Sequence, residues 1–120
     1  MHNKQLGDRG EALARQYLIK QGYQIITSNF RTPRGEIDLV ARKDGVLIFI
    51  EVKYRTDLDQ GHPAEAITKR KLQNLRAAIA QYLLDSERAD FRPIKIDALC
   101  IIHLPGSEPV FEIFPDILGP

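Results

Sequence analysis

The alternation of apolar and polar positions divides the chain into helical and extended segments. Apolar residues recur at helical spacing over residues 8–21 and again over residues 68–85. Gly22 is a typical helix stop directly after the first of these segments. The Gly-His-Pro sequence at residues 61–63 is typical of the start of a further helical segment. The order of helix, three strands, helix and two strands predicts an α/β sandwich around a mixed sheet. Strand patterns cover residues 23–30, two runs within 35–53, and the segments 94–104 and 110–114.

A β-hairpin is predicted by the Asp-Gly pair at residues 44–45, because these residue types favour the tight turns that join antiparallel strands. A two-residue loop at this point sets the register of the two strands. Asp38 then lies opposite Glu51, and Glu36 lies opposite Lys53. Because side chains alternate along a strand, these four ionisable residues share one face of the hairpin. The opposite face carries Ile37, Leu39, Ile50 and Val52.

The shared face concentrates negative charge. Opposed side chains on antiparallel strands have Cβ atoms roughly 4.5 to 5.5 Å apart, so Asp38 and Glu51 need a counter-charge. Lys53 supplies one positive charge against three carboxylates, and the surplus suits a hard divalent cation, Mg²⁺ or Mn²⁺. Charged residues also alternate on ordinary solvated strands. The apolar run over residues 46–50 favours a functional cluster, because it predicts a central strand where an unneeded charge is costly.

Glu11 is a further carboxylate with two interpretations. It lies in the first predicted helix at the edge of the buried face, in line with Ala14 and Leu18. In one interpretation its side chain points inward, toward the carboxylate cluster. In the other it only interacts favourably with the positive end of the helix dipole. The residue pattern favours neither interpretation.

Length, charge and hydropathy narrow the class of protein. A chain of 120 residues predicts a single domain over 1–120. The 17 basic and 16 acidic residues nearly cancel, so net charge neither predicts nor excludes a nucleic-acid partner. No apolar run reaches the roughly 20 residues of a membrane span, and the first residues lack the apolar core of a signal peptide. We therefore expect a cytoplasmic protein without membrane contact, in which the lone Cys100 is a buried core residue.

Basic residues surround the carboxylates in the sequence. Residues 68–76 include no acidic residue, and three cations occupy the predicted first turn of the second helix, against the favourable direction of the dipole. A phosphate bound there would explain this arrangement, and a solvated basic helix face is the alternative. Without a recognition-helix signature or Trp, we expect contacts to the backbone and shape of DNA. The basic residues concerned are Arg31, Arg34, Arg55, Lys69, Arg70, Lys71 and Arg76.

Structural roles are expected or favoured for several other polar residues. Asp97 lies in a predicted buried strand, where a salt bridge near the site is the expected role. Glu36 is either an outer metal ligand or the salt-bridge partner of Lys53, and the second role is favoured. The three histidines have no ligand spacing, so surface or turn roles are expected for them.

Four segments of the chain resemble the YraN-like family of small bacterial proteins. By this resemblance the chain belongs to the restriction-endonuclease-like, or PD-(D/E)XK, superfamily, whose related enzymes of known activity include archaeal Holliday junction resolvases. The resemblance implies an α/β/α sandwich around a mixed central β-sheet. No proline precedes Asp38, and Tyr54 stands where a small hydroxyl residue is more common. The segments are Gly10-Glu11, Gly35-Glu36-Ile37-Asp38-Leu39, Phe49-Ile50-Glu51-Val52-Lys53-Tyr54-Arg55 and the helix over residues 69–83.

The resemblance also implies the residues of the site. Asp38 matches the superfamily aspartate, and Glu51 and Lys53 match its (D/E)-x-K pair, so these three are the candidate catalytic residues. Glu11 matches the glutamate in the first helix of the resolvase branch. In such a site Asp38, Glu51 and the backbone carbonyl of Val52 bind the metal, and Glu11 helps directly or through water. Lys53 orients the attacking water.

Two classes of function follow. The first is a Mg²⁺- or Mn²⁺-dependent endodeoxyribonuclease that acts on branched or otherwise structured DNA. The second is a non-catalytic DNA-binding or assembly protein that keeps the fold. The complete set of Asp38, Glu51 and Lys53 favours the first, whereas the small size of the chain is compatible with the second. Concerted cutting of both strands of a junction would need a symmetric homodimer.

Overall fold

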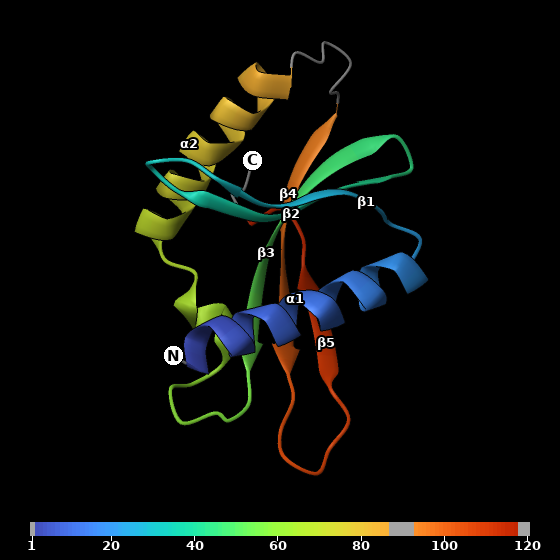
Figure 1. Cartoon of the computed structure of the whole chain (residues 1–120), viewed down its shortest axis with the longest axis vertical. Helices are drawn as coiled ribbons and strands as arrows, with labels where there is room; N and C mark the ends of the chain where they lie inside the picture. Colours follow the sequence, from blue (N-terminus) through green and yellow to red (C-terminus); the bar gives the residue numbers. More distant parts are fainter. Residues whose placement is uncertain (1, 87–92, 118–120) are drawn as a thin grey trace.

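The computed structural model describes residues 2–86 and 93–117. Within these ranges, two α-helices lie on opposite faces of one five-stranded sheet (Figure 1). The predicted order of helix, three strands, helix and two strands is confirmed, and a short 3₁₀-helix begins at the proline of the Gly-His-Pro sequence. The elements are α1 (His2–Lys20), β1 (Gln24–Arg31), β2 (Glu36–Lys43), β3 (Val46–Arg55), η1 (Pro63–Ala66), α2 (Lys69–Ser86), β4 (Ile94–Ile102) and β5 (Val110–Phe114).

The sheet is mixed because one connection crosses over it. The strand order is β1-β2-β3-β4-β5, in which β3 and β4 are parallel and all other neighbours are antiparallel. Parallel neighbours need a long crossover connection, which here contains η1 and α2. With α1 on the other face, the result is the predicted restriction-endonuclease-like α/β/α sandwich.

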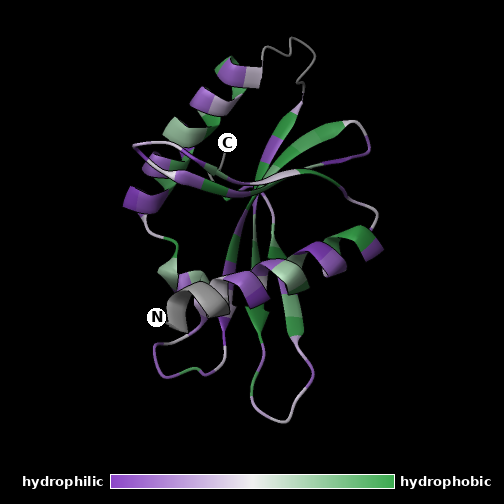
Figure 2. Cartoon of the chain, in the orientation of Figure 1, coloured by the Kyte–Doolittle hydropathy of each residue, from purple (hydrophilic) through white to green (hydrophobic). Residues whose placement is uncertain are grey.

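Each helix covers one apolar face of the sheet. In Figure 2 both helices alternate between hydrophilic and hydrophobic turns, so each can bury one stripe against the strands. The buried residues on the α1 face are Ala14, Leu18, Leu39, Ala41, Ile48, Ile50, Leu99 and Ile101. Those on the α2 face are Ile37, Val40, Leu47, Phe49, Leu75, Ala78, Ile79 and Tyr82.

Two expectations about apolar segments can be compared with the structure. Cys100 is buried on β4, where burial raises the pKa of its thiol to about 11, so it is a core residue as predicted. In the described part of the chain, neither α1 nor α2 combines the length and apolar character that a membrane-crossing helix needs.

The hairpin of β2 and β3 has the predicted register near its turn. Lys43 pairs with Val46, and the ladder continues to the pair formed by Leu39 and Ile50. The turn residues have the left-handed conformations that such a loop requires, with φ values of 52° and 77°. The local Asp-Gly signal therefore predicts the register as far as the ladder extends.

The predictions for the far end of the hairpin are wrong in two respects. The expected pairs of Asp38 with Glu51 and of Glu36 with Lys53 are both absent because the ladder of β2 and β3 has already ended, and Glu36 pairs with Arg31 of β1 instead. Ile37 belongs to the α2 face, although strict alternation predicts the α1 face. The alternation of side chains between the two faces is therefore interrupted at Asp38, between Ile37 and Leu39.

The contact of α1 with β3 at Gly10 leaves no room for a side chain. A Cβ at Gly10 would lie 2.7 Å from Cβ of Tyr54, whereas a Cβ at Gly7 would meet nothing within 4 Å among the described residues. We expect Gly10→Ala to destabilise the fold by roughly 1–3 kcal/mol through overpacking. Gly7→Ala, the matched control, should stabilise it by roughly 0.5–1 kcal/mol through helix propensity. Urea unfolding measures both, and equal stability of the two variants would contradict the close contact.

Candidate functional site

The candidate site lies in a fork where β2 and β3 separate. Beyond the pair of Leu39 and Ile50, the backbone N–H of Val52 donates a hydrogen bond to Oδ2 of Asp38, at 2.7 Å. A side-chain carboxylate of β2 thus takes the position of a backbone acceptor from that strand. This bond holds Asp38 between the two strands.

Glu51 and Lys53 project from the β3 side of the fork. Nζ of Lys53 lies 2.9 Å from Oε2 of Glu51, and only 14% and 16% of the two side chains are exposed. Limited exposure reduces solvent screening and strengthens this pair. The favoured role of Glu36 as partner of Lys53 is wrong, because Oε1 of Glu36 lies 3.5 Å from Nε of Arg31 instead.

The environment of Asp38 disfavours its negative charge. Burial, followed by the negative charge of Glu51, raises the pKa of Asp38 from 3.8 to about 7. Glu36 acts in the same direction, whereas the N–H of Val52 and the ammonium group of Lys53 oppose the shift. The fork therefore has more negative charge than its own residues neutralise. A carboxyl group perturbed by both burial and a like charge marks a candidate functional site.

Lys71, in the first turn of α2, contacts Lys53. This contact is the largest cause that lowers the pKa of Lys71, ahead of burial, and the charge of Arg55 acts in the same direction. For Lys53, burial lowers the pKa, but Glu51 and the amine of Lys71 outweigh burial, and the net change is a rise. Three cations from β3 and α2 are therefore gathered beside Glu51.

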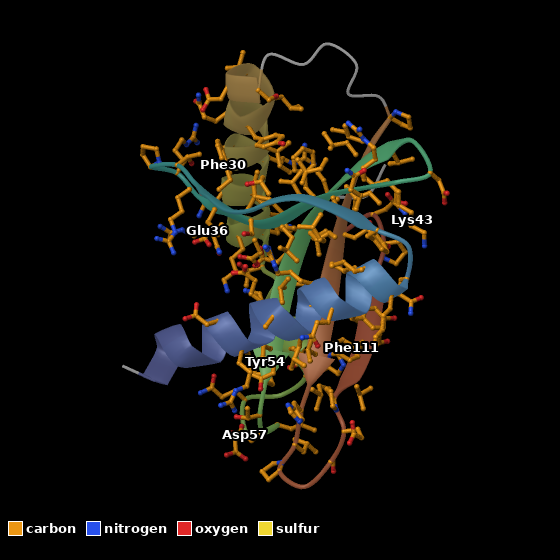
Figure 3. All side chains as sticks on the ribbon, turned by 45° about the vertical axis from the view of Figure 1, so that its right-hand side comes forward. Phe30, Glu36, Lys43, Tyr54, Asp57 and Phe111 are labelled. Carbon is orange, nitrogen blue, oxygen red and sulfur yellow. The ribbon has the colours of Figure 1, made fainter. Side chains whose placement is uncertain are left out.

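A cavity of about 660 Å³ opens at the fork, and α1, β1, β2 and β3 all contribute to its lining. Helix α1 crosses in front of the sheet in Figure 3, with Glu36 above it and Tyr54 close to it. Glu51 is not among the described residues that line the cavity, although its charge acts on Asp38. The lining includes Glu11, Asn29, Asp38, Val52, Lys53 and Arg55.

Glu11 points toward the cavity, which supports the inward interpretation of this residue. Asn29 donates a hydrogen bond from Nδ2 to Oε1 of Glu11 at 2.6 Å, and Nη1 of Arg15 lies 3.6 Å from Oε2. The sequence did not identify Asn29 as a candidate. The available signal was its residue type, because Asn is uncommon in strands and tolerates the left-handed conformation found here, with φ 55°.

The oxygen atoms of the site suit a hard divalent cation but form an incomplete shell. Asp38 and Glu51 are close enough for their charges to interact, and Val52 lines the cavity beside them. Both carboxylate oxygens of Glu11 have partners on α1 or β1. Over residues 2–86 and 93–117, no three His, Cys, Asp or Glu side chains are arranged to hold an ion. A bound Mg²⁺ would therefore keep much of its water shell.

The predicted phosphate-contacting residues of α2 and the β1–β2 turn lie at one helix. The N–H of Lys71 donates to Oγ1 of Thr68 at 3.2 Å, so Thr68 caps α2 as expected. The turn packs directly on α2, since a Cβ at Gly35 would lie 2.5 Å from the carbonyl oxygen of Asn74. The predicted basic residues of these two elements are all exposed: Arg34, Lys69, Arg70, Lys71 and Arg76.

Asp97 is buried and has structural partners. Oδ1 of Asp97 accepts a hydrogen bond from the N–H of Asp116 at 3.0 Å, and Oδ2 lies 3.8 Å from Nζ of Lys95. The expected salt bridge is confirmed, but its expected position near the site is wrong. The carboxylate lies beside Leu18 and Tyr23 rather than in the lining of the cavity, so Asp97 has no place in the candidate site.

The fold and the fork together define a class of protein. A mixed five-stranded sheet between two helices, with an ion-paired Glu-x-Lys on the strand after the hairpin turn, is the arrangement of a small restriction-endonuclease-like domain. The chain belongs to the UPF0102 family, because the profile described as "Uncharacterised protein family UPF0102" matches residues 10–101. The predicted YraN-like resemblance is thereby confirmed.

Several bacterial relatives extend this similarity over most of the chain. A UPF0102 protein of Syntrophomonas wolfei is 43% identical over 111 residues, which cover 92% of this chain and 96% of the relative. One from Dehalococcoides mccartyi is 39% identical over 118 residues, covering 98% and 96%. One from Lachnoclostridium phytofermentans is 41% identical over 102 residues, covering 85% and 86%. The family match includes every candidate site residue from Glu11 to Lys71.

Proposed function

We propose that this protein is a Mg²⁺- or Mn²⁺-dependent endonuclease that hydrolyses phosphodiester bonds in DNA. The observation that carries the proposal is the fork, where the carboxylates of Asp38 and Glu51 meet Lys53 in a largely buried position. Buried like charges are costly unless something compensates them. A divalent cation and the phosphate that it attracts would compensate them.

Each residue of the fork has a separate role in the proposed reaction. Asp38, Glu51 and the backbone carbonyl of Val52 would hold the cation, with Glu11 as a further ligand directly or through water. When bound, the cation lowers the pKa of a water molecule and stabilises negative charge on the phosphate. Lys53 orients the attacking water and stabilises the charge that develops on the scissile phosphate. Its pairing with Glu51 keeps the ammonium group in place.

Basic side chains near the fork would bind the DNA backbone. Arg55 lines the cavity, and Lys71 contacts Lys53 at the start of α2. Lys71 therefore connects the proposed DNA-binding surface to the catalytic lysine. Such contacts recognise phosphates and shape rather than base sequence. We propose branched or otherwise structured DNA as the substrate, because contacts of this kind recognise the positions of phosphates and the shape of DNA.

A non-catalytic DNA-binding or assembly protein is the second candidate function. The observation that favours it is the incomplete ligand set, because the described residues form no three-carboxylate group around one point. In that case the basic surface would bind DNA, and the carboxylates of the fork would have a structural role.

Cleavage of a panel of DNA substrates distinguishes the two functions. We expect nicking of four-way or flapped DNA that requires Mg²⁺ or Mn²⁺ and exceeds cleavage of linear duplex, because the proposed reaction needs a cation that these residues can hold. The measurement is product formation on labelled linear, flapped and four-way substrates, with and without chelator. Glu51→Gln, purified in parallel, controls for contaminating nucleases. Tight binding of all substrates without any metal-dependent product would support the binding protein instead.

A further inference from the structure

Asn29 has a backbone conformation that a β-strand does not require. Its φ of 55° is left-handed, which is unfavourable for a residue other than glycine. The other described non-glycine residues with positive φ, Asp44 and Asp116, lie outside the strands. Asn29 lies within β1 and is exposed, so burial in the core does not account for this conformation.

This conformation occurs opposite Asp38. The two strands keep the same register on both sides, pairing Ser28 with Leu39 and Phe30 with Ile37, whereas the pair between them is absent from the ladder. Side-chain alternation breaks at the same point, since Leu39 packs on the α1 face and Ile37 on the α2 face. Asp38 therefore lacks regular pairing with β1 just where regular pairing with β3 has ended.

The side chain of Asn29 reaches from β1 to α1. Its amide nitrogen lies 2.6 Å from Oε1 of Glu11, a short distance that is typical of a hydrogen bond to a charged acceptor. Arg15 approaches the other carboxylate oxygen at 3.6 Å, from the next turn of the same helix. Of these two contacts, only the one from the Asn29 amide comes from the sheet. This contact therefore sets the direction of the Glu11 carboxylate relative to the fork.

We propose that Asn29 is a positioning residue, whose amide holds the carboxylate of Glu11 at the cavity that Asp38 also lines. The left-handed backbone turns the amide toward α1 and leaves the ladder open at Asp38. This inference rests on the proposed function for the role of Glu11 in metal binding. It assigns to Asn29 no contact with DNA or with the reacting atoms.

Asn29→Gly tests the amide without changing the backbone preference, because glycine adopts positive φ readily. We expect the variant to unfold within a few degrees of the parent, to bind Mn²⁺ about 10- to 100-fold more weakly, and to lose a similar factor in kcat at unchanged KM for DNA. Asp44→Gly, at a left-handed residue in the hairpin turn, is the matched control and should change none of these values. Calorimetry on the free proteins gives the Mn²⁺ affinities.

A double variant tests whether Asn29 acts through Glu11. Once Glu11→Ala has removed the carboxylate, adding Asn29→Gly should cause no further loss of Mn²⁺ affinity. A further loss would overturn the proposal, and so would equal Mn²⁺ affinity in the parent and Asn29→Gly. A parent that binds Mn²⁺ in an Asn29-dependent way but cuts no DNA would contradict the nuclease and support the positioning role. A parent that does not bind Mn²⁺ would overturn both.

Discussion

Lys53→Ala is expected to lower kcat for DNA cleavage by at least roughly 100-fold while changing DNA affinity little. The substitution removes the ammonium group that is proposed to orient the water and to stabilise charge on the phosphate. DNA affinity should persist because the exposed cations of α2 and Arg34 remain. Single-turnover cleavage and fluorescence anisotropy measure the two quantities. If Lys53→Ala cleaves as fast as the parent, the proposed hydrolytic mechanism is wrong.

Arg70→Ala and Lys20→Ala complete this comparison. Arg70 is exposed in the first turn of α2, so its removal should weaken binding across all sequences and reduce the salt slope by about one unit. At saturating DNA its cleavage rate should equal that of the parent. Lys20 is exposed at the C-terminal end of α1, so Lys20→Ala is the control for the loss of one positive charge away from the proposed DNA-binding surface. If Lys53 and Arg70 variants lose binding equally, Lys53 is a phosphate contact and not a catalytic residue.

Asp38→Asn is expected to raise thermal stability at pH 8 and to abolish cleavage. Because the pKa of Asp38 rises from 3.8 to about 7 on folding, the folded state binds more protons than the unfolded state between these values. Stability of the parent therefore falls as pH rises from about 4 to about 7 and stays lower above that range. Asn keeps an acceptor for the N–H of Val52 without the charge. We expect the variant to gain roughly 5–10 °C in Tm at pH 8 and little near pH 4.

Thermal scans at several pH values, with Asp59→Asn as the control, measure this effect. Asp59 is exposed in the loop after β3, so its neutralisation should change Tm little at any pH. Mg²⁺ should stabilise the parent at pH 8 and leave Asp38→Asn unchanged, because the cation binds the ionised fork. A Tm difference between Asp38→Asn and the parent that does not vary with pH would contradict the raised pKa of Asp38 in the folded protein.

The order of elements and the register of the hairpin were predictable because local interactions determine them. The pattern of residues 68–85 has helical spacing, and α2 spans Lys69–Ser86. The Asp-Gly pair permits a tight turn with two left-handed residues, which leaves one register for the strands beside it. The alternation along β3 likewise placed Glu51 and Lys53 on one face, and they form an ion pair.

Errors began where the ladder of β2 and β3 ended. The sequence does not show how far two strands remain paired, because this depends on the twist of the sheet and on what packs against its faces. Extrapolation of the hairpin register therefore gave Glu36 the wrong partner and Ile37 the wrong face. The metal ligands implied by the resemblance stay a prediction. The charges of Asp38 and Glu51 interact, and the carboxylate of Glu11 is bound by other side chains.

Local residue patterns specified the helices, the strands, the hairpin turn and the presence of an acidic cluster with one lysine, because each depends on residues close along the chain. Three contacts depend on how the elements pack: Asn29 with Glu11, Lys71 with Lys53, and Asp38 with the backbone of the neighbouring strand. These contacts join different elements, with sequence separations of 18 positions for Glu11 and Asn29 and 14 for Asp38 and Val52. Their geometry results from packing both helices on a twisted sheet, and no local residue pattern contains that information.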